Sequence, residues 1–115
     1  MLTPAQFRAL ALSLPGTSEG AHMGHPDFRT GGKVFATLGY PGAEWAMVKL
    51  TSEQQQMLVD AEPQMFVPVK GTWGLRGATN VRLAAADQRT VRSALTMAWR
   101  NVTEAKPKKP RQPAA

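Results

Sequence analysis

The spacing of apolar residues predicts a helix at the start of the chain. The stripe consists of Phe7, Leu10, Ala11 and Leu14, which recur every three or four residues. Thr3 stands before Pro4, and Gln6 follows Thr3 by three residues, an order typical of a helix start with a capping box. The pair Pro15-Gly16 predicts the end of this helix.

Two β-type runs follow, over residues 27–30 and 33–40, and the Gly31-Gly32 pair between them predicts a two-residue hairpin turn. Counted outward from this turn, Phe28 falls opposite Phe35. The same count places Arg29 opposite Val34, and the side chains expected to face the helices are Val34, Ala36 and Leu38.

The next expected elements are a strand over residues 44–50 and a short helix that begins after Thr51. Alternate residues of the strand are apolar, so Ala46, Val48 and Leu50 are expected to face inward and Trp45, Met47 and Lys49 outward. Gln54 completes a capping box with Thr51, and Pro63 ends the helix. The inward side chains of this helix are expected to be Met57, Leu58 and Ala61.

The last third of the chain predicts one more strand and a long amphipathic helix. Residues 65–77 are interpreted as a loop or a broken edge strand, because Pro68 lacks the N–H that a central strand needs. Residues 79–83 predict a strand, and Asp87 begins the helix. The apolar side of this helix comprises Val91, Ala94, Leu95, Ala98 and Val102, and its polar side Arg89, Arg92, Thr96 and Arg100.

This order of elements predicts an α+β fold, with a mainly antiparallel sheet and helices packed on one face. The length of 115 residues suits one domain, expected over residues 1–105. Residues 106–115 contain three prolines and no large apolar residue, so we expect a disordered tail there.

The net charge of +6 is concentrated at the end of the chain. Four cations lie in the last ten residues, namely Lys106, Lys108, Lys109 and Arg111, so the remaining ten basic residues face eight acidic ones. Cysteine is absent, which excludes disulfides, thiolate nucleophiles and cysteine metal sites and favours a cytoplasmic location. No apolar run reaches the roughly 20 residues that span a bilayer, so no membrane partner is expected.

Several short motifs occur together in one order. They are Leu12-Ser13-Leu14-Pro15-Gly16, Glu19, Gly24-His25-Pro26 with Phe28-Arg29, Gly32-Lys33-Val34-Phe35-Ala36, Lys49-Leu50, Gly71-Thr72-Trp73-Gly74 and Ala98-Trp99. This combination resembles the MmcQ/YjbR family of small bacterial proteins, which are often labelled DNA-binding. The resemblance implies a frataxin-like, or CyaY-like, α+β fold and a DNA-binding role without a cofactor.

The residues expected to bind nucleic acid are cations with nearby aromatic rings. In the folded part they are Arg29, Lys33, Lys49, Trp73, Arg76 and Arg82, with Phe28 and Trp45 as further rings, and in the tail they are Lys106, Lys108, Lys109 and Arg111. The alternative is a protein-interaction or ligand-binding module, with an apolar groove near Trp45, Phe66 and Trp73 and no nucleic-acid role. In either case a monomer is expected.

A metal site or a catalytic site is not expected. Glu19, His22 and His25 have the spacing of ligands on one helix face, but Gly20 and Gly24 argue against a helix there. Two histidines without a cysteine make an incomplete site, and His25 is instead expected to satisfy backbone groups. The chain contains no nucleophile elbow, phosphate loop or carboxylate pair, so we expect a protein that is not an enzyme.

Overall fold

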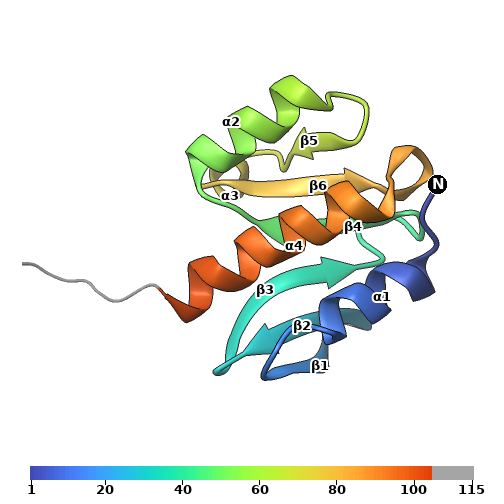
Figure 1. The fold of residues 1–115 in the computed structure, drawn as a ribbon, viewed down its shortest axis with the longest axis vertical. Helices are drawn as coiled ribbons and strands as arrows, with labels where there is room; N and C mark the ends of the chain where they lie inside the picture. Colours follow the sequence, from blue (N-terminus) through green and yellow to red (C-terminus); the bar gives the residue numbers. More distant parts are fainter. Residues whose placement is uncertain (105–115) are drawn as a thin grey trace, which may run out of the picture.

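The computed structural model describes residues 1–104, which form a six-stranded antiparallel sheet with helices packed against it (Figure 1). The strands lie in the order β1-β2-β3-β4-β6-β5. The elements are α1 (Pro4–Leu12), β1 (Thr17–His22), β2 (His25–Thr30), β3 (Lys33–Leu38), β4 (Trp45–Lys49), α2 (Ser52–Ala61), β5 (Phe66–Pro68), α3 (Thr72–Leu75), β6 (Ala78–Arg82), a 3-10 turn (Leu83–Ala85) and α4 (Gln88–Thr103). The α+β prediction is therefore confirmed.

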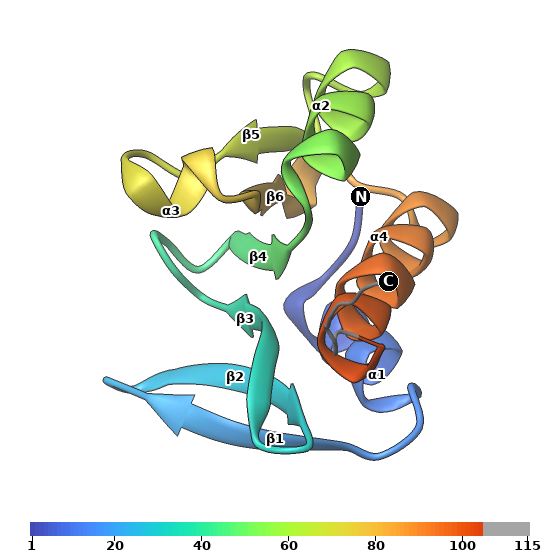
Figure 2. The same ribbon diagram turned by 90° about the vertical axis from the view of Figure 1, so that its left-hand side faces the viewer.

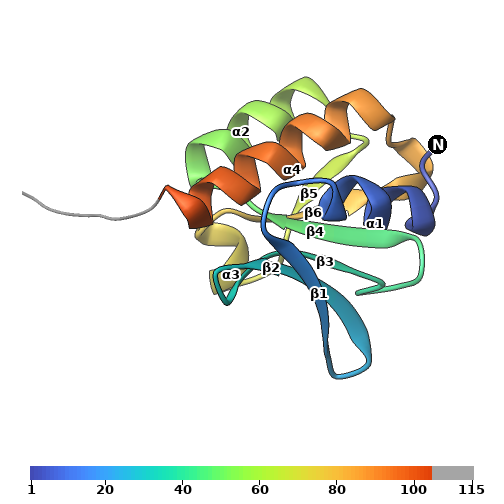
Figure 3. The same cartoon turned by 60° about the horizontal axis from the view of Figure 1, so that its bottom comes forward.

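The three longer helices cover the same face of the sheet. Figure 2 shows α1, α2 and α4 on one side, while α3 and the tip of the β1-β2 hairpin extend on the other. Figure 3 shows the same division, with the hairpin pointing away from the helical layer. None of the helices in the described part of the chain is long and apolar enough to cross a membrane.

Helix α4 lies across the middle of the sheet and contributes its apolar side to the core. Val91, Ala94, Leu95 and Ala98 are buried as the sequence predicts, and the helix packs on β3 and β4. The two alanines let the helix backbone lie close to the strands, where Ala36 and Ala46 are also fully buried. The arginines of the polar side remain exposed.

The predicted helix starts are confirmed. The side chains of Thr3 and Thr51 each accept a hydrogen bond from the backbone N–H three residues on. The side chains of Gln6 and Gln54 accept a hydrogen bond from the Thr3 and Thr51 N–H in turn, which completes both capping boxes. The Asp87 side chain caps α4 in the same position.

The predicted pairing of Phe28 with Phe35 is wrong, although the Gly31-Gly32 turn is confirmed with both φ angles positive. Arg29 does pair with Val34, but a bulge follows, and Phe28 pairs with Ala36. The extra residue is Phe35, which has no partner in this register. Phe28 and Phe35 both lie in the hydrophobic core, where they are fully buried.

One more residue beside this bulge does not face the helices as predicted. Val34 was expected among the inward side chains, but it pairs with Arg29 and is only half-buried, whereas Ala36 and Leu38 are buried as predicted.

The predicted inner face of α2 is also wrong in part. Leu58 is buried, but Met57 is 51% exposed and Ala61 is exposed. The helix is turned so that the Gln55 side chain points inward, and its amide nitrogen lies within 3.1 Å of the Gly74 and Ala78 carbonyl oxygens and the Thr79 hydroxyl. Hydrogen bonding, which hydrophobic periodicity does not detect, therefore sets the rotation of this helix.

Between residues 65 and 77, the sequence anticipates the edge strand but not a helix. Strand β5 pairs with β6 at the edge of the sheet and ends at Pro68, as expected for a proline that cannot donate a ladder hydrogen bond. The one-turn helix α3, which carries Trp73, was not predicted.

Replacing Phe28 with alanine should lower the free energy of unfolding by about 3 to 5 kcal/mol, measured by urea denaturation, because it removes a fully buried ring whose centroid lies 6.2 Å from that of Phe7. Leu75→Ala is the control, since Leu75 is 80% exposed, and should change stability by less than about 0.5 kcal/mol. Equal losses in the two variants would contradict the burial of Phe28.

Candidate nucleic-acid interface on the open face of the sheet

The face of the sheet away from the three longer helices carries alternate side chains of β4 and β6. Trp45, Met47 and Lys49 are half-buried, whereas Ala46 and Val48 between them are fully buried, which confirms the predicted alternation. The register pairs Trp45 with Arg82 and Met47 with Asn80. We call this surface, defined by Trp45, Met47, Lys49, Asn80 and Arg82 together with Trp73, the open face.

A cation lies over an aromatic ring at each end of β4. The Arg82 guanidinium is 4.6 Å from the centre of the Trp45 ring, and the Lys49 ammonium is 5.2 Å from that of Trp73. Trp45 and Lys49 are four positions apart on an extended strand, with three residues between them, so the two pairs are about 13 Å apart. The Arg82 side chain also donates a hydrogen bond to the Gln64 carbonyl oxygen, which fixes its position.

Glycine allows Trp73 to be held at the edge of this surface. A Cβ atom at Gly74 would lie 1.6 Å from the Val69 carbonyl oxygen, so the close approach of α3 to the residue after β5 excludes any side chain at this position. Gly71, at the start of α3, has a φ of 79°, in the region that favours glycine. The Trp73 side chain is left 61% exposed.

Arg29 is held by a carboxylate on the same strand. Its guanidinium donates two hydrogen bonds of 2.9 Å to Asp27, whose side chain is buried. These hydrogen bonds, and next the charge of the carboxylate, raise the pKa of Arg29 above its ordinary value. Gly20 on the neighbouring strand leaves room for the pair, since a Cβ there would lie 2.9 Å from the Asp27 carboxylate. The ion pair therefore offsets the charge of Arg29.

The fold brings only some of the sequence-predicted residues together. Lys49, Trp73 and Arg82 meet on the open face, and Arg29 reaches the same side of the sheet. Lys33 pairs with the buried Thr30 and is itself exposed, beside the hairpin turn. Arg76 is exposed at the end of α3. Phe28 and Phe66 are core residues, and Lys106, Lys108, Lys109 and Arg111 lie outside the described residues.

Sequence reasoning did not include two residues of the open face in the candidate site. Met47 and Asn80 face each other between the two cation-ring pairs. The predicted alternation of residues 44–50 contained the signal for Met47, because it already placed this residue outward.

Two of the residues considered for a metal site, Glu19 and His25, make other contacts. Glu19 forms an ion pair with Arg8 of α1, and the ring of His25 packs edge-on against Tyr40, with centroids 5.5 Å apart. Among residues 1–104 there is no group of three or more metal-ligating side chains.

A family model described as YjbR matches residues 12–101, which is most of the chain and includes every strand. The chain belongs to the YjbR family. In this YjbR domain the match covers the whole open face, from Trp45 to Arg82.

The solved structure of Deinococcus radiodurans protein DR2400, described as a DUF419 domain, is similar to this YjbR chain. The two share 16% sequence identity over 92% of this chain and 83% of the other, with a TM-score of 0.73. At this identity the similarity extends to the fold alone. A search of curated proteins found none that matches.

Gly74→Ala should lower the free energy of unfolding by about 1 to 3 kcal/mol or more, because the added methyl group overlaps the Val69 carbonyl oxygen. Gly42→Ala is the matched control, since a Cβ there has only an ordinary contact of 3.5 Å with Trp45, and it should be nearly neutral. Urea denaturation measures both, and tolerance of alanine at residue 74 would show that α3 does not lie so close to the Val69 backbone.

Proposed function

We propose that this YjbR domain is a non-enzymatic, cytoplasmic protein that binds single-stranded DNA on its open face. The observation that carries the proposal is the pair of cation-ring contacts at the two ends of β4. Aromatic rings give bases a surface on which to stack, and the cation over one side of each ring supplies positive charge for a phosphate.

The geometry favours a single strand over a duplex. Bases must be unstacked to reach Trp73 or Trp45, and in a single strand they are free to do so. The separation of about 13 Å between the two cation-ring pairs leaves room for a short run of nucleotides over Met47 and Asn80. Stacking on rings tolerates every base, so this surface predicts weak sequence preference.

The charge of the open face predicts modest, salt-dependent affinity. Lys49 and Arg82 supply its net positive charge, because the Arg29 charge is offset by Asp27. Two phosphate contacts to a single strand give a slope of log affinity against log salt of about −1.4. The proposal is restricted to the residues that the fold brings together and does not rest on the tail.

Replacing Lys49 and Arg82 together with glutamine should remove most of this slope. Trp73→Ala should weaken binding by about tenfold, through the loss of one stacked base. Fluorescence anisotropy of a labelled oligothymidine, at about 50 and 200 mM salt, measures both effects with the full chain.

The matched control is Lys33→Gln with Arg89→Gln, which removes the same charge from exposed positions off the open face. It should leave the slope nearly unchanged. If the control and the open-face variant lose affinity equally, binding is a general charge effect and the proposal is wrong.

A protein partner is the second candidate, and it is favoured by the exposed apolar side chains of α3. Trp73 and Leu75 are 61% and 80% exposed and lie on the same one-turn helix. Absence of oligothymidine binding by the full chain, at low salt and high protein concentration, would leave this candidate as the better account of α3.

A further inference from the structure

The helical layer exposes two helices of opposite charge, which approach each other where the Asn101 side chain meets Gln54. Helix α2 contains Glu53 and Asp60 and no basic residue, whereas α4 contains Arg89, Arg92 and Arg100 and no acidic residue. Both helices lie on the same side of the sheet, away from the open face (Figures 1 and 3). Each of these five charged side chains is exposed.

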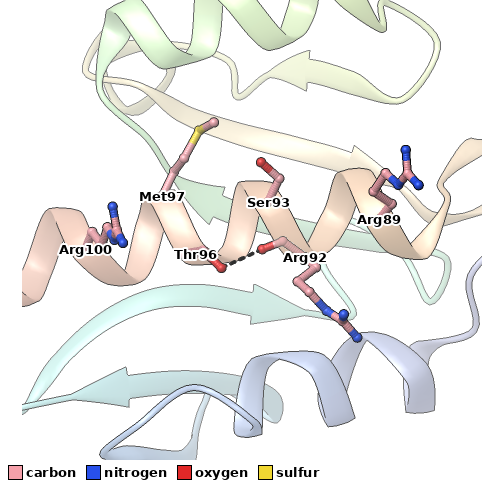
Figure 4. Close-up of a pocket in the computed structure, with 6 residues that line it drawn as sticks. All are labelled: Arg89, Arg92, Ser93, Thr96, Met97 and Arg100. Atoms are coloured by element: carbon pink, nitrogen blue, oxygen red, sulfur yellow. Dashed lines mark hydrogen bonds between the residues drawn. The ribbon is translucent and has the colours of Figure 1, made fainter.

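Each helix also presents a methionine between its charges. On α2, Met57 is 51% exposed, and it follows Glu53 by four residues and precedes Asp60 by three, so the three side chains form one stripe. On α4, half-buried Met97 lies between Arg92 and Arg100. Figure 4 shows the α4 side chains around a shallow depression of about 470 Å³ that residues of α4 alone line, with Met97 and Ser93 pointing toward α2 and Arg92 pointing toward α1.

We propose that the α2-α4 surface binds a second copy of this chain, with α2 of each copy resting on α4 of the other. A two-fold axis that runs parallel to the two helices and midway between them produces this arrangement. It places α2 of the first copy on α4 of the second and, at the same time, α2 of the second on α4 of the first. Stacking α4 on α4 would bring arginine against arginine, and stacking α2 on α2 would bring carboxylate against carboxylate. The charge pattern therefore selects the crossed arrangement.

A hydrogen bond within the chain sets the register of this contact. The Asn101 amide donates to the Gln54 side chain over 2.8 Å, so these two residues lie at the same level along the antiparallel helices. The proposed two-fold axis preserves levels along the helices. Met57 then meets Met97, and Glu53 and Asp60 each lie within about one turn of Arg100 and Arg92 of the other copy.

This dimer would replace the monomer expected from the sequence. It leaves the open face of each copy uncovered and is independent of nucleic-acid binding. Because its ion pairs are solvent-exposed and screened by salt, self-association should be weak and strongest at low ionic strength.

Sedimentation of the full chain at rising concentration in low salt tests the proposal, with no nucleic acid present. The parent should approach twice the monomer mass. Glu53→Arg with Asp60→Arg makes both helices basic, and Arg92→Glu with Arg100→Glu makes both acidic. Each variant alone should self-associate at least about tenfold more weakly than the parent.

Mixing the two variants should restore association, because every contact then joins a basic helix to an acidic one. All four changes in one chain should restore it too. Circular dichroism confirms that each variant is folded, and the exchanged charges are all on exposed positions.

The proposal is overturned if the parent stays monomeric at its highest soluble concentration, if either variant alone associates as well as the parent, or if the mixture does not associate. Loss of duplex DNA binding in the acidic variant, with a parent that remains monomeric, would assign α4 to nucleic acid instead and likewise overturn it.

Discussion

The packing of α4 on β3 and β4 is the contact on which the rest of the structure depends. Its inner face is made of small and medium side chains, and Val91, Ala94 and Ala98 have no exposed surface. With the helices gathered on one face, the outward residues of the strands lack a covering layer, and the structure stabilises them in other ways. Rings packed beneath cations and a carboxylate under a guanidinium serve this purpose on β2, β4 and β6.

The elements that were predictable from the sequence are those fixed by neighbours along the chain. Capping boxes at Thr3 and Thr51, the glycine pair of the hairpin and the alternation of β4 each involve residues a few positions apart. The bulge between Phe28 and Arg29 was not predictable, because no particular residue type marks the position of an extra residue in one strand of a pair. The rotation of α2 was missed for a related reason, since Gln55 is polar and yet points inward.

The candidate site was predictable as a set of residue types and not as a surface. Lys49, Trp73 and Arg82 were named from charge and aromaticity. Nothing in the nearby sequence indicates that the Lys49 ammonium of β4 lies 5.2 Å from the centre of the Trp73 ring of α3. Arg29 was named as a free cation, although Asp27, two residues earlier on the same face of a strand, could have suggested the ion pair. Long-range packing decides the first case, whereas the second rests on two residues of one strand.

One side-chain amide joins the helical layer to the position of Trp73. Gln55 of α2 donates to the carbonyl oxygen of Gly74, the residue after Trp73, and reaches β6 through Ala78 and Thr79. A tilt of α2 therefore displaces the acceptor that anchors α3, and the ring moves with it. Gln55 therefore couples the helical layer to the position of the Trp73 ring on the opposite side of the sheet.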